Sequence, residues 1–92
     1  MTLEQTLIFG AARAVIERRR DAHRIPYTAT AIDIHFELAG RLSRCQIQQE
    51  MQIMARECPE LMTVGHTLND LFCALPHIGD GLPQQQTTNN KQ

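Results

Sequence analysis

The sequence predicts a small α+β domain that is mostly helical, and three patterns in the chain support this fold class. Apolar residues recur with helical spacing over residues 3–22 and again over residues 28–58. Residues 62–75 are instead rich in residues that favour strands and turns. The chain has 92 residues, enough for one domain, which we place at residues 1–76. An all-α four-helix bundle is the alternative fold.

Residues 3–22 read as one long helix with Thr2 placed to cap its N-terminus. The apolar side of this helix is wider than the stripe that a surface helix buries, because Phe9 and Ile16 lie away from the main stripe. Such a helix either crosses the core or packs against a second copy of itself. We therefore expect a homodimer.

Residues 28–58 read as two capped helices joined by a short turn. Thr30 and Asp33 have the spacing of a capping box for the first helix, and Gly40 is placed to end it in the left-handed conformation. Ser43 and Gln46 have the spacing of a second capping box. The chain thus stops one helix and starts another at once, which is a helix-turn-helix pattern.

The first helix of this pair has an apolar arc that covers much of its circumference. Ile34, Leu38 and Phe36 all belong to the arc, so we expect all of them to pack against the core. His35 lies in the middle of the same arc. This position favours a hydrogen-bonded core histidine over a catalytic base.

The second helix of the pair, residues 43–58, has a narrow apolar stripe opposite a face rich in glutamine. The stripe consists of Ile47, Met51, Met54 and Cys58. A glutamine amide both donates and accepts hydrogen bonds, so it can match a base edge in the major groove of DNA. Glutamine is also a good surface helix former, and this plainer interpretation stays open. The candidate DNA contacts on this helix are Arg44, Gln48, Gln49, Gln52 and Arg56.

Charge is distributed unevenly along the chain. Residues 13–24 hold five arginines against two acidic residues, a local charge of +3, although the whole chain carries −1. Arginine suits bidentate contacts to phosphate, so Arg18, Arg19 and Arg20 are candidate phosphate contacts beside the helix pair. The alternative is a solvated last turn of the first helix, where cations complement the helix dipole. The near-neutral total charge argues against a generally basic, nucleic-acid-binding surface.

Short strands are expected before and after the helix pair. Pro26 forces an extended backbone before it, which suggests a strand over residues 25–28. Residues 62–75 alternate as two strands around Asn69 and Asp70, both of which suit a hairpin turn. A helix capped at Thr67 fits the same stretch almost as well. We favour the hairpin, because residues 63–67 are poor helix formers.

The order of elements over residues 3–76 resembles that of winged helix-turn-helix domains. In those domains a helix, a short strand, a helix and a recognition helix precede a two-stranded hairpin called the wing. The resemblance rests on the order of elements and not on a signature motif. It implies a DNA-binding regulatory protein, with double-stranded DNA as its partner and the 43–58 helix in the major groove.

The rival hypothesis is a helical module that binds another protein, or a second copy of itself. It would use the wide apolar side of the first helix and a methionine-rich face around Met51, Met54 and Met62. Methionine surfaces adapt readily to partners.

Other functional classes find little support in the sequence. The only serine, Ser43, is assigned to a helix cap, and no hydrolase or P-loop motif occurs, so we expect neither an enzyme nor a cofactor. The spacing of Cys58, His66 and Cys73 does not suit a zinc site. No apolar run reaches the roughly 18 residues of a membrane span, and no signal-peptide layout is present. We expect a cytoplasmic protein that ends in a disordered polar tail over residues 77–92.

Overall fold

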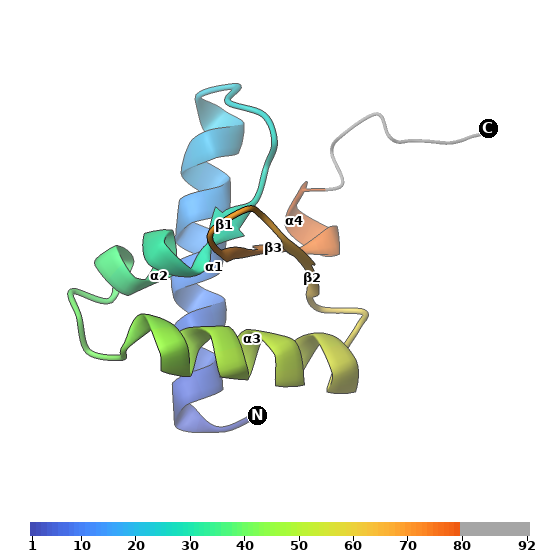
Figure 1. Ribbon diagram of the computed structural model, residues 1–92. Helices are drawn as coiled ribbons and strands as arrows, with labels where there is room; N and C mark the ends of the chain where they lie inside the picture. The colour runs from blue at the N-terminus through green and yellow to red at the C-terminus, as the bar shows by residue number, and fades with distance from the viewer. Residues whose placement is uncertain (80–92) are drawn as a thin grey trace.

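The structure is a computed structural model, and it describes residues 1–79 of the chain. Within these residues helices and short antiparallel strands combine into a small, mostly helical α+β fold (Figure 1). This class was predicted from the sequence, and the all-α alternative is wrong. The elements in order are α1 (Leu3–Asp21), β1 (Ala29–Thr30), α2 (Ala31–Glu37), α3 (Arg44–Glu57), β2 (Thr63–His66), β3 (Leu71–Ala74) and α4 (Pro76–Gly79).

Helix α1 is the long central element against which the other three helices pack. Thr2 caps it through a complete capping box, in which the Thr2 Oγ1 accepts from the Gln5 amide and the Gln5 Oε1 accepts from the Thr2 amide, both at 3.1 Å. Ile8, Ala12 and Ile16 of α1 are fully buried. Much of the wide apolar side of α1 is thus covered by the chain's own helices, although Leu3 remains exposed and Phe9 is half-buried, and its width alone does not require a second copy.

Helices α2 and α3 meet at a tight turn over residues 38–43. The predicted capping box of α2 is present, with Thr30 and Asp33 bonding each other's backbone amides at 3.1 Å. The helix ends at Glu37, and both Ala39 and Gly40 then adopt left-handed backbone, with φ of 54° and 79°. Helix α2 therefore stops earlier than Gly40 alone suggests, because the reversal uses two left-handed residues and not one.

The strands form a three-stranded antiparallel sheet in the order β1-β3-β2. Ala29 pairs with Cys73, so the first strand lies just after the stretch 25–28 that the sequence suggested. The hairpin over residues 62–75 is confirmed. Within it Gly65 lies opposite Phe72, and a side chain on Gly65 would meet the Phe72 ring at 2.5 Å. The glycine therefore leaves room for the ring to lie across the outer face of the sheet.

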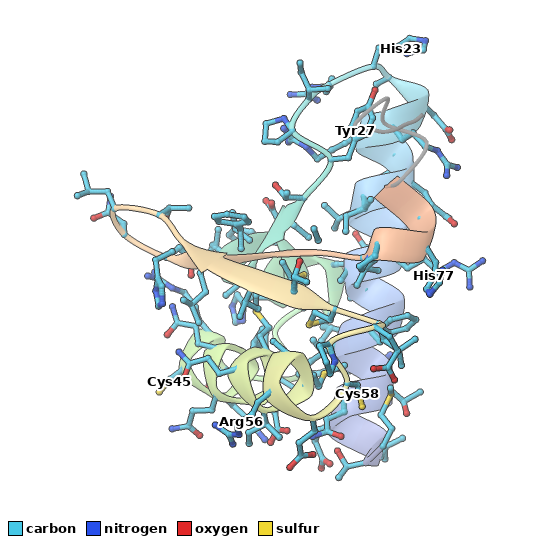
Figure 2. The ribbon with its side chains drawn as sticks, turned by 90° about the vertical axis from the view of Figure 1, so that its right-hand side faces the viewer. His23, Tyr27, Cys45, Arg56, Cys58 and His77 are labelled. Carbon is cyan, nitrogen blue, oxygen red and sulfur yellow. The ribbon has the colours of Figure 1, made fainter. Side chains whose placement is uncertain are left out.

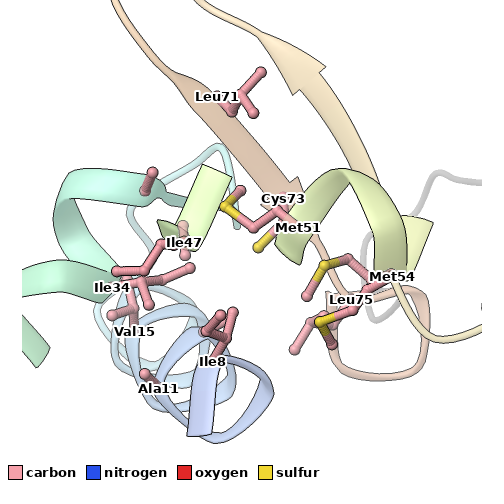
Figure 3. Close-up of a cluster of buried hydrophobic side chains, with 14 of the residues drawn as sticks. Ile8, Ala11, Val15, Ile34, Ile47, Met51, Met54, Leu71, Cys73 and Leu75 are labelled. Atoms are coloured by element: carbon pink, nitrogen blue, oxygen red, sulfur yellow. The ribbon is translucent and has the colours of Figure 1, made fainter. Parts of the chain in front are cut away.

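The hydrophobic core lies between α1, α3 and the inner face of the sheet (Figure 3). It is aliphatic and sulfur-rich, and Met51, Met54 and Met62 are almost completely buried in it. Cys73 is also fully buried, and this burial raises the pKa of its thiol to about 12. The thiol is therefore neutral and packs as a small apolar side chain.

Two predictions about α2 had different outcomes. His35 is hydrogen-bonded as predicted, with its Nδ1 2.8 Å from the Leu42 carbonyl oxygen, but it is half-buried and not part of the core. Phe36 was expected in the core but is 73% exposed. Two residues after the buried Ile34, it lies about 200° further around the helix, and α2 packs on the Ile34 side. The predicted arc was too wide because α2 is a short helix with only one buried face.

The predicted start of the polar tail at residue 77 was too early. Residues 77–79 continue a short helix, and Ile78 packs against the core. Arg20 reaches across from α1 to donate to the Ile78 carbonyl oxygen at 3.2 Å. The Ile78 side chain and the hydrogen bond from Arg20 together attach this stretch to the fold. Residues 80–92, the rest of the predicted tail, lie outside the described part of the chain.

Candidate nucleic-acid interface

Helix α3 lies on the surface with one buried face and one polar face. Ile47, Met51 and Met54 are buried, as the sequence predicted, whereas Cys58, the fourth residue of the predicted stripe, is half-buried and stands just after the end of α3. The opposite face is exposed, and Figure 2 shows Cys45 and Arg56 on the side of α3 that points away from the strands. We call this exposed face the α3 stripe; it consists of Cys45, Gln49, Gln52 and Arg56.

The start of α3 is set by Ser43. Its Oγ accepts a hydrogen bond from the Gln46 amide at 3.1 Å, which satisfies one of the unpaired amides of the first turn. The Gln46 side chain is exposed. Only half of the predicted capping box is therefore present, because the Gln46 side chain does not accept a hydrogen bond from the Ser43 amide.

Asp70, at the end of the hairpin turn, is the most constrained acidic side chain near α3. Only 9% of this side chain is exposed. Its carboxylate accepts from the Gln48 Nε2 at 2.9 Å and from the backbone amides of Ile32 at 3.0 Å and Leu71 at 2.8 Å. The Nε of Arg44 lies 3.6 Å from it. Asp70 thereby ties the hairpin to both α2 and α3.

The pKa of Asp70 is lowered from its ordinary value by this environment. Burial works against the charged form, but the hydrogen bonds from Gln48, Ile32 and Leu71 and the nearby charge of Arg44 outweigh it. The carboxylate is therefore ionised at neutral pH. It is a fixed negative charge at the point where α3 meets the hairpin.

Two of the predicted DNA contacts, Arg44 and Gln48, are engaged inside the protein. Gln48 is half-buried and donates to Asp70. Arg44 donates from Nη2 to the Asn69 carbonyl oxygen at 2.6 Å, in addition to its approach to Asp70. Its side chain remains 46% exposed, so part of the guanidinium is accessible from outside. The other three, Gln49, Gln52 and Arg56, lie exposed on the α3 stripe.

The hairpin turn projects from the body of the molecule (Figure 2). Thr67 closes it: its amide donates to the Asp70 carbonyl oxygen at 2.8 Å, and its Oγ1 accepts from the Asp70 amide at 2.8 Å. Leu68, at the tip, is 96% exposed. The hairpin tip is therefore an exposed element that is closed by hydrogen bonds at Thr67, and its base is held to α3 by Asp70.

Arg18 lies beside the helix pair, as expected from the sequence, because it forms a salt bridge with Glu37 of α2, but the arginines of α1 do not adjoin the α3 stripe. Gln5, near the start of α1, donates to Glu50 of α3 at 2.9 Å. Arg18 follows 13 residues later, about 20 Å further along the axis at 1.5 Å per residue. Figure 1 shows the same separation, with α3 crossing the N-terminal half of α1.

Each of these arginines instead contacts a neighbouring part of the fold. Arg18 forms a salt bridge with Glu37 at the end of α2, which lowers the pKa of Glu37 and raises that of Arg18. Arg19 donates to the Pro26 carbonyl oxygen at 2.8 Å, and Arg20 to that of Ile78. The open hollow beside them, about 670 Å³, is also lined by Asp21 and Asp33. Acidic groups thus offset much of the positive charge in this region.

The described residues offer no metal-binding cluster. Among residues 1–79 no group of three or more His, Cys, Asp or Glu side chains could hold a metal ion. Cys45, Cys58 and Cys73 are free thiols, and only Cys45 is classed as exposed. No helix in the same part of the chain is both long and apolar enough to cross a membrane.

Comparison with protein-family models, with curated proteins and with solved structures finds no match to this chain.

Sequence reasoning missed Asp70 as a structural residue. Asp70 was assigned only to the hairpin turn, yet it joins two helices that lie 22 and 38 residues away in the sequence. An acidic residue in a polar turn carries no local signal of such partners. Only the pairing of β2 with β3 and their packing on α3 bring these groups together.

Proposed function

We propose that this protein binds double-stranded DNA as a winged helix-turn-helix domain, with α3 in the major groove and the β2–β3 hairpin as the wing. The order α1-β1-α2-α3-β2-β3 is the order of elements in domains of that kind. The tight turn between α2 and α3 supports the same assignment. An α-helix fits the width of the major groove of B-form DNA.

One observation carries this proposal: α3 exposes a stripe of groups that can read bases, beside a hairpin that projects from the fold. Gln49 and Gln52 can each donate and accept toward a base edge, and Arg56 can bind guanine or phosphate. A helix that served only to cover the core would not need this composition, although it would tolerate it.

The charge of the protein sets a limit on the strength of non-specific binding. Near α3 the exposed arginines are Arg41, Arg44 and Arg56, whereas Arg18, Arg19 and Arg20 lie at the far end of α1. If at most three phosphates are neutralised, the logarithm of the DNA-binding constant should fall with the logarithm of the salt concentration at a slope no steeper than about −2.7. Specificity would then depend on base contacts more than on charge.

The rival function, a protein-binding module, lacks the surface on which it was based. Met51, Met54 and Met62 are buried in the core, and much of the wide apolar side of α1 is covered by other helices. The large apolar residues that remain exposed, among them Leu3, Ile25 and Leu68, come from separate parts of the chain.

The direct test is a titration of labelled duplex DNA with the full chain, read by fluorescence anisotropy at several salt concentrations. We expect binding in low salt, and a loss of affinity for Gln49→Ala and Arg56→Ala with an unchanged circular dichroism spectrum. Arg13→Ala, an exposed arginine of α1 paired with Glu17, is the control and should bind like the parent protein. Absence of binding at tens of micromolar protein in low salt contradicts the proposal, since even non-specific association is ordinarily detectable there.

A further inference from the structure

The polar residues on α3 differ in what they already contact. Gln48 and Gln49 are neighbours of the same residue type, yet Gln48 is half-buried against Asp70 and Gln49 is exposed. Within residues 1–79 the side chains of Gln49 and Gln52 have no hydrogen-bond partner, whereas Arg44 and Gln48 contact the hairpin turn. This difference suggests two separate tasks on one helix.

We propose that Gln49 and Gln52 determine which base pairs are preferred, while Gln48 and Arg44 act with Asp70 as positioning residues that hold the hairpin against α3. The inference rests on the proposed function, which it deepens by assigning the readers. It differs from the expectation from the sequence, in which all five candidate residues of α3 contact DNA.

The burial of Asp70 explains why Gln48 is not available to DNA. If the Gln48 amide turned toward a base, it would leave a carboxylate that is 9% exposed without one of its donors. Removing a partner from a buried charged group costs more than an ordinary hydrogen bond returns. Gln48 therefore stays with Asp70 when the protein binds its partner.

The chemistry of the exposed pair predicts the class of site. A glutamine amide pairs in a bidentate manner with N6 and N7 of adenine in the major groove. Gln49 and Gln52 are separated by three residues, about 4.5 Å of rise along α3, which is close to the 3.4 Å spacing of stacked bases. We therefore expect a duplex in which two adjacent or nearly adjacent A·T pairs face these two side chains.

The test compares Gln48→Ala with Gln49→Ala in the full chain. A preferred duplex is first selected from a pool of random duplexes by the parent protein. For each variant we then measure the affinity for that duplex relative to duplexes in which one A·T pair is replaced by G·C. Thermal unfolding is measured on the same samples, and Gln48→Met, which keeps the aliphatic stem, replaces Gln48→Ala if the latter does not fold.

We expect Gln49→Ala to reduce the preference at one base pair by roughly 5- to 150-fold while the melting temperature stays unchanged. Gln48→Ala should lower the melting temperature and leave the preference within about twofold of the parent value. Loss of preference with Gln48→Ala, but not with Gln49→Ala, would overturn the assignment. So would binding without any selected preference. Absence of all duplex binding would instead reject the proposed function itself.

Discussion

Asp70 is the residue on which the geometry of the candidate interface most depends. Its carboxylate accepts hydrogen bonds from the hairpin itself, from the start of α2 and from α3. This side chain therefore helps to set the position of the hairpin relative to the helix that would read DNA, together with the hydrogen bond from Arg44 to Asn69. The salt bridge of Arg18 with Glu37 is far more exposed, and pairs of that kind add little to stability.

Replacement of Asp70 by alanine should lower the free energy of unfolding by about 2 to 3 kcal/mol, because three donors lose a buried acceptor. Asp21→Ala, which removes an acidic side chain that is 75% exposed, should change it by less than about 0.5 kcal/mol. Urea denaturation at neutral pH measures both. Equal stability of the two variants would show that the Asp70 contacts do not hold the fold.

The same residue predicts an acid dependence of stability. Because folding lowers the pKa of Asp70, its contribution is present above the unfolded value of about 3.9 and is lost as the pH falls through the lower folded value. The urea midpoint of the parent protein should therefore fall below about pH 4. In Asp70→Ala this fall should be smaller, and the remainder should come from other carboxylates such as Glu37.

Among the helices and strands, features that depend on neighbouring residues were predictable from the sequence, and features that depend on long-range packing were not. The caps at Thr2, Thr30 and Ser43 were predictable, because each depends on residues within one helical turn. The exposure of Phe36 was not, because it depends on which side of α2 meets α1 and α3. The candidate DNA contacts on α3 show the same difference. Gln48 is half-buried because it bonds to Asp70, a turn residue far along the chain, and no local pattern indicates this contact.

Substitutions at Gly10 and Gly40 test how the local backbone conformation affects the stability of the helices. Gly10 lies inside α1 with open space around it, so Gly10→Ala should raise the free energy of unfolding by about 0.5 to 1 kcal/mol. Gly40 has a φ of +79°, so Gly40→Ala should lower it by roughly 1 to 2 kcal/mol despite equal space. Chemical denaturation of both variants measures these opposite changes. A loss of stability in Gly10→Ala would mean that a neighbouring surface packs closely there.

The protein has a net charge close to zero, and most of the large apolar side chains in residues 1–79 are buried or half-buried. Much of the apolar side of α1 is covered by the chain's own elements, which weakens the argument from apolar width for a homodimer. The dimer stays a prediction, and sedimentation velocity at micromolar concentration tests it. A species of 10.4 kDa would contradict the dimer, whereas one of twice that mass would support it. If the Gly10→Ala substitution dissociated such a dimer, the contact between the two copies would lie on α1.

The central claim is that DNA contacts α3 and the hairpin tip, and nuclear magnetic resonance tests it most directly. Amide signals of the isotope-labelled full chain are followed during titration with duplex DNA in low salt. We expect the amide signals of residues 45–56 and 66–69 to shift, and those of residues 18–24 to stay unchanged. Shifts confined to residues 18–24, or no shifts at protein and duplex concentrations of about 100 μM, would contradict it.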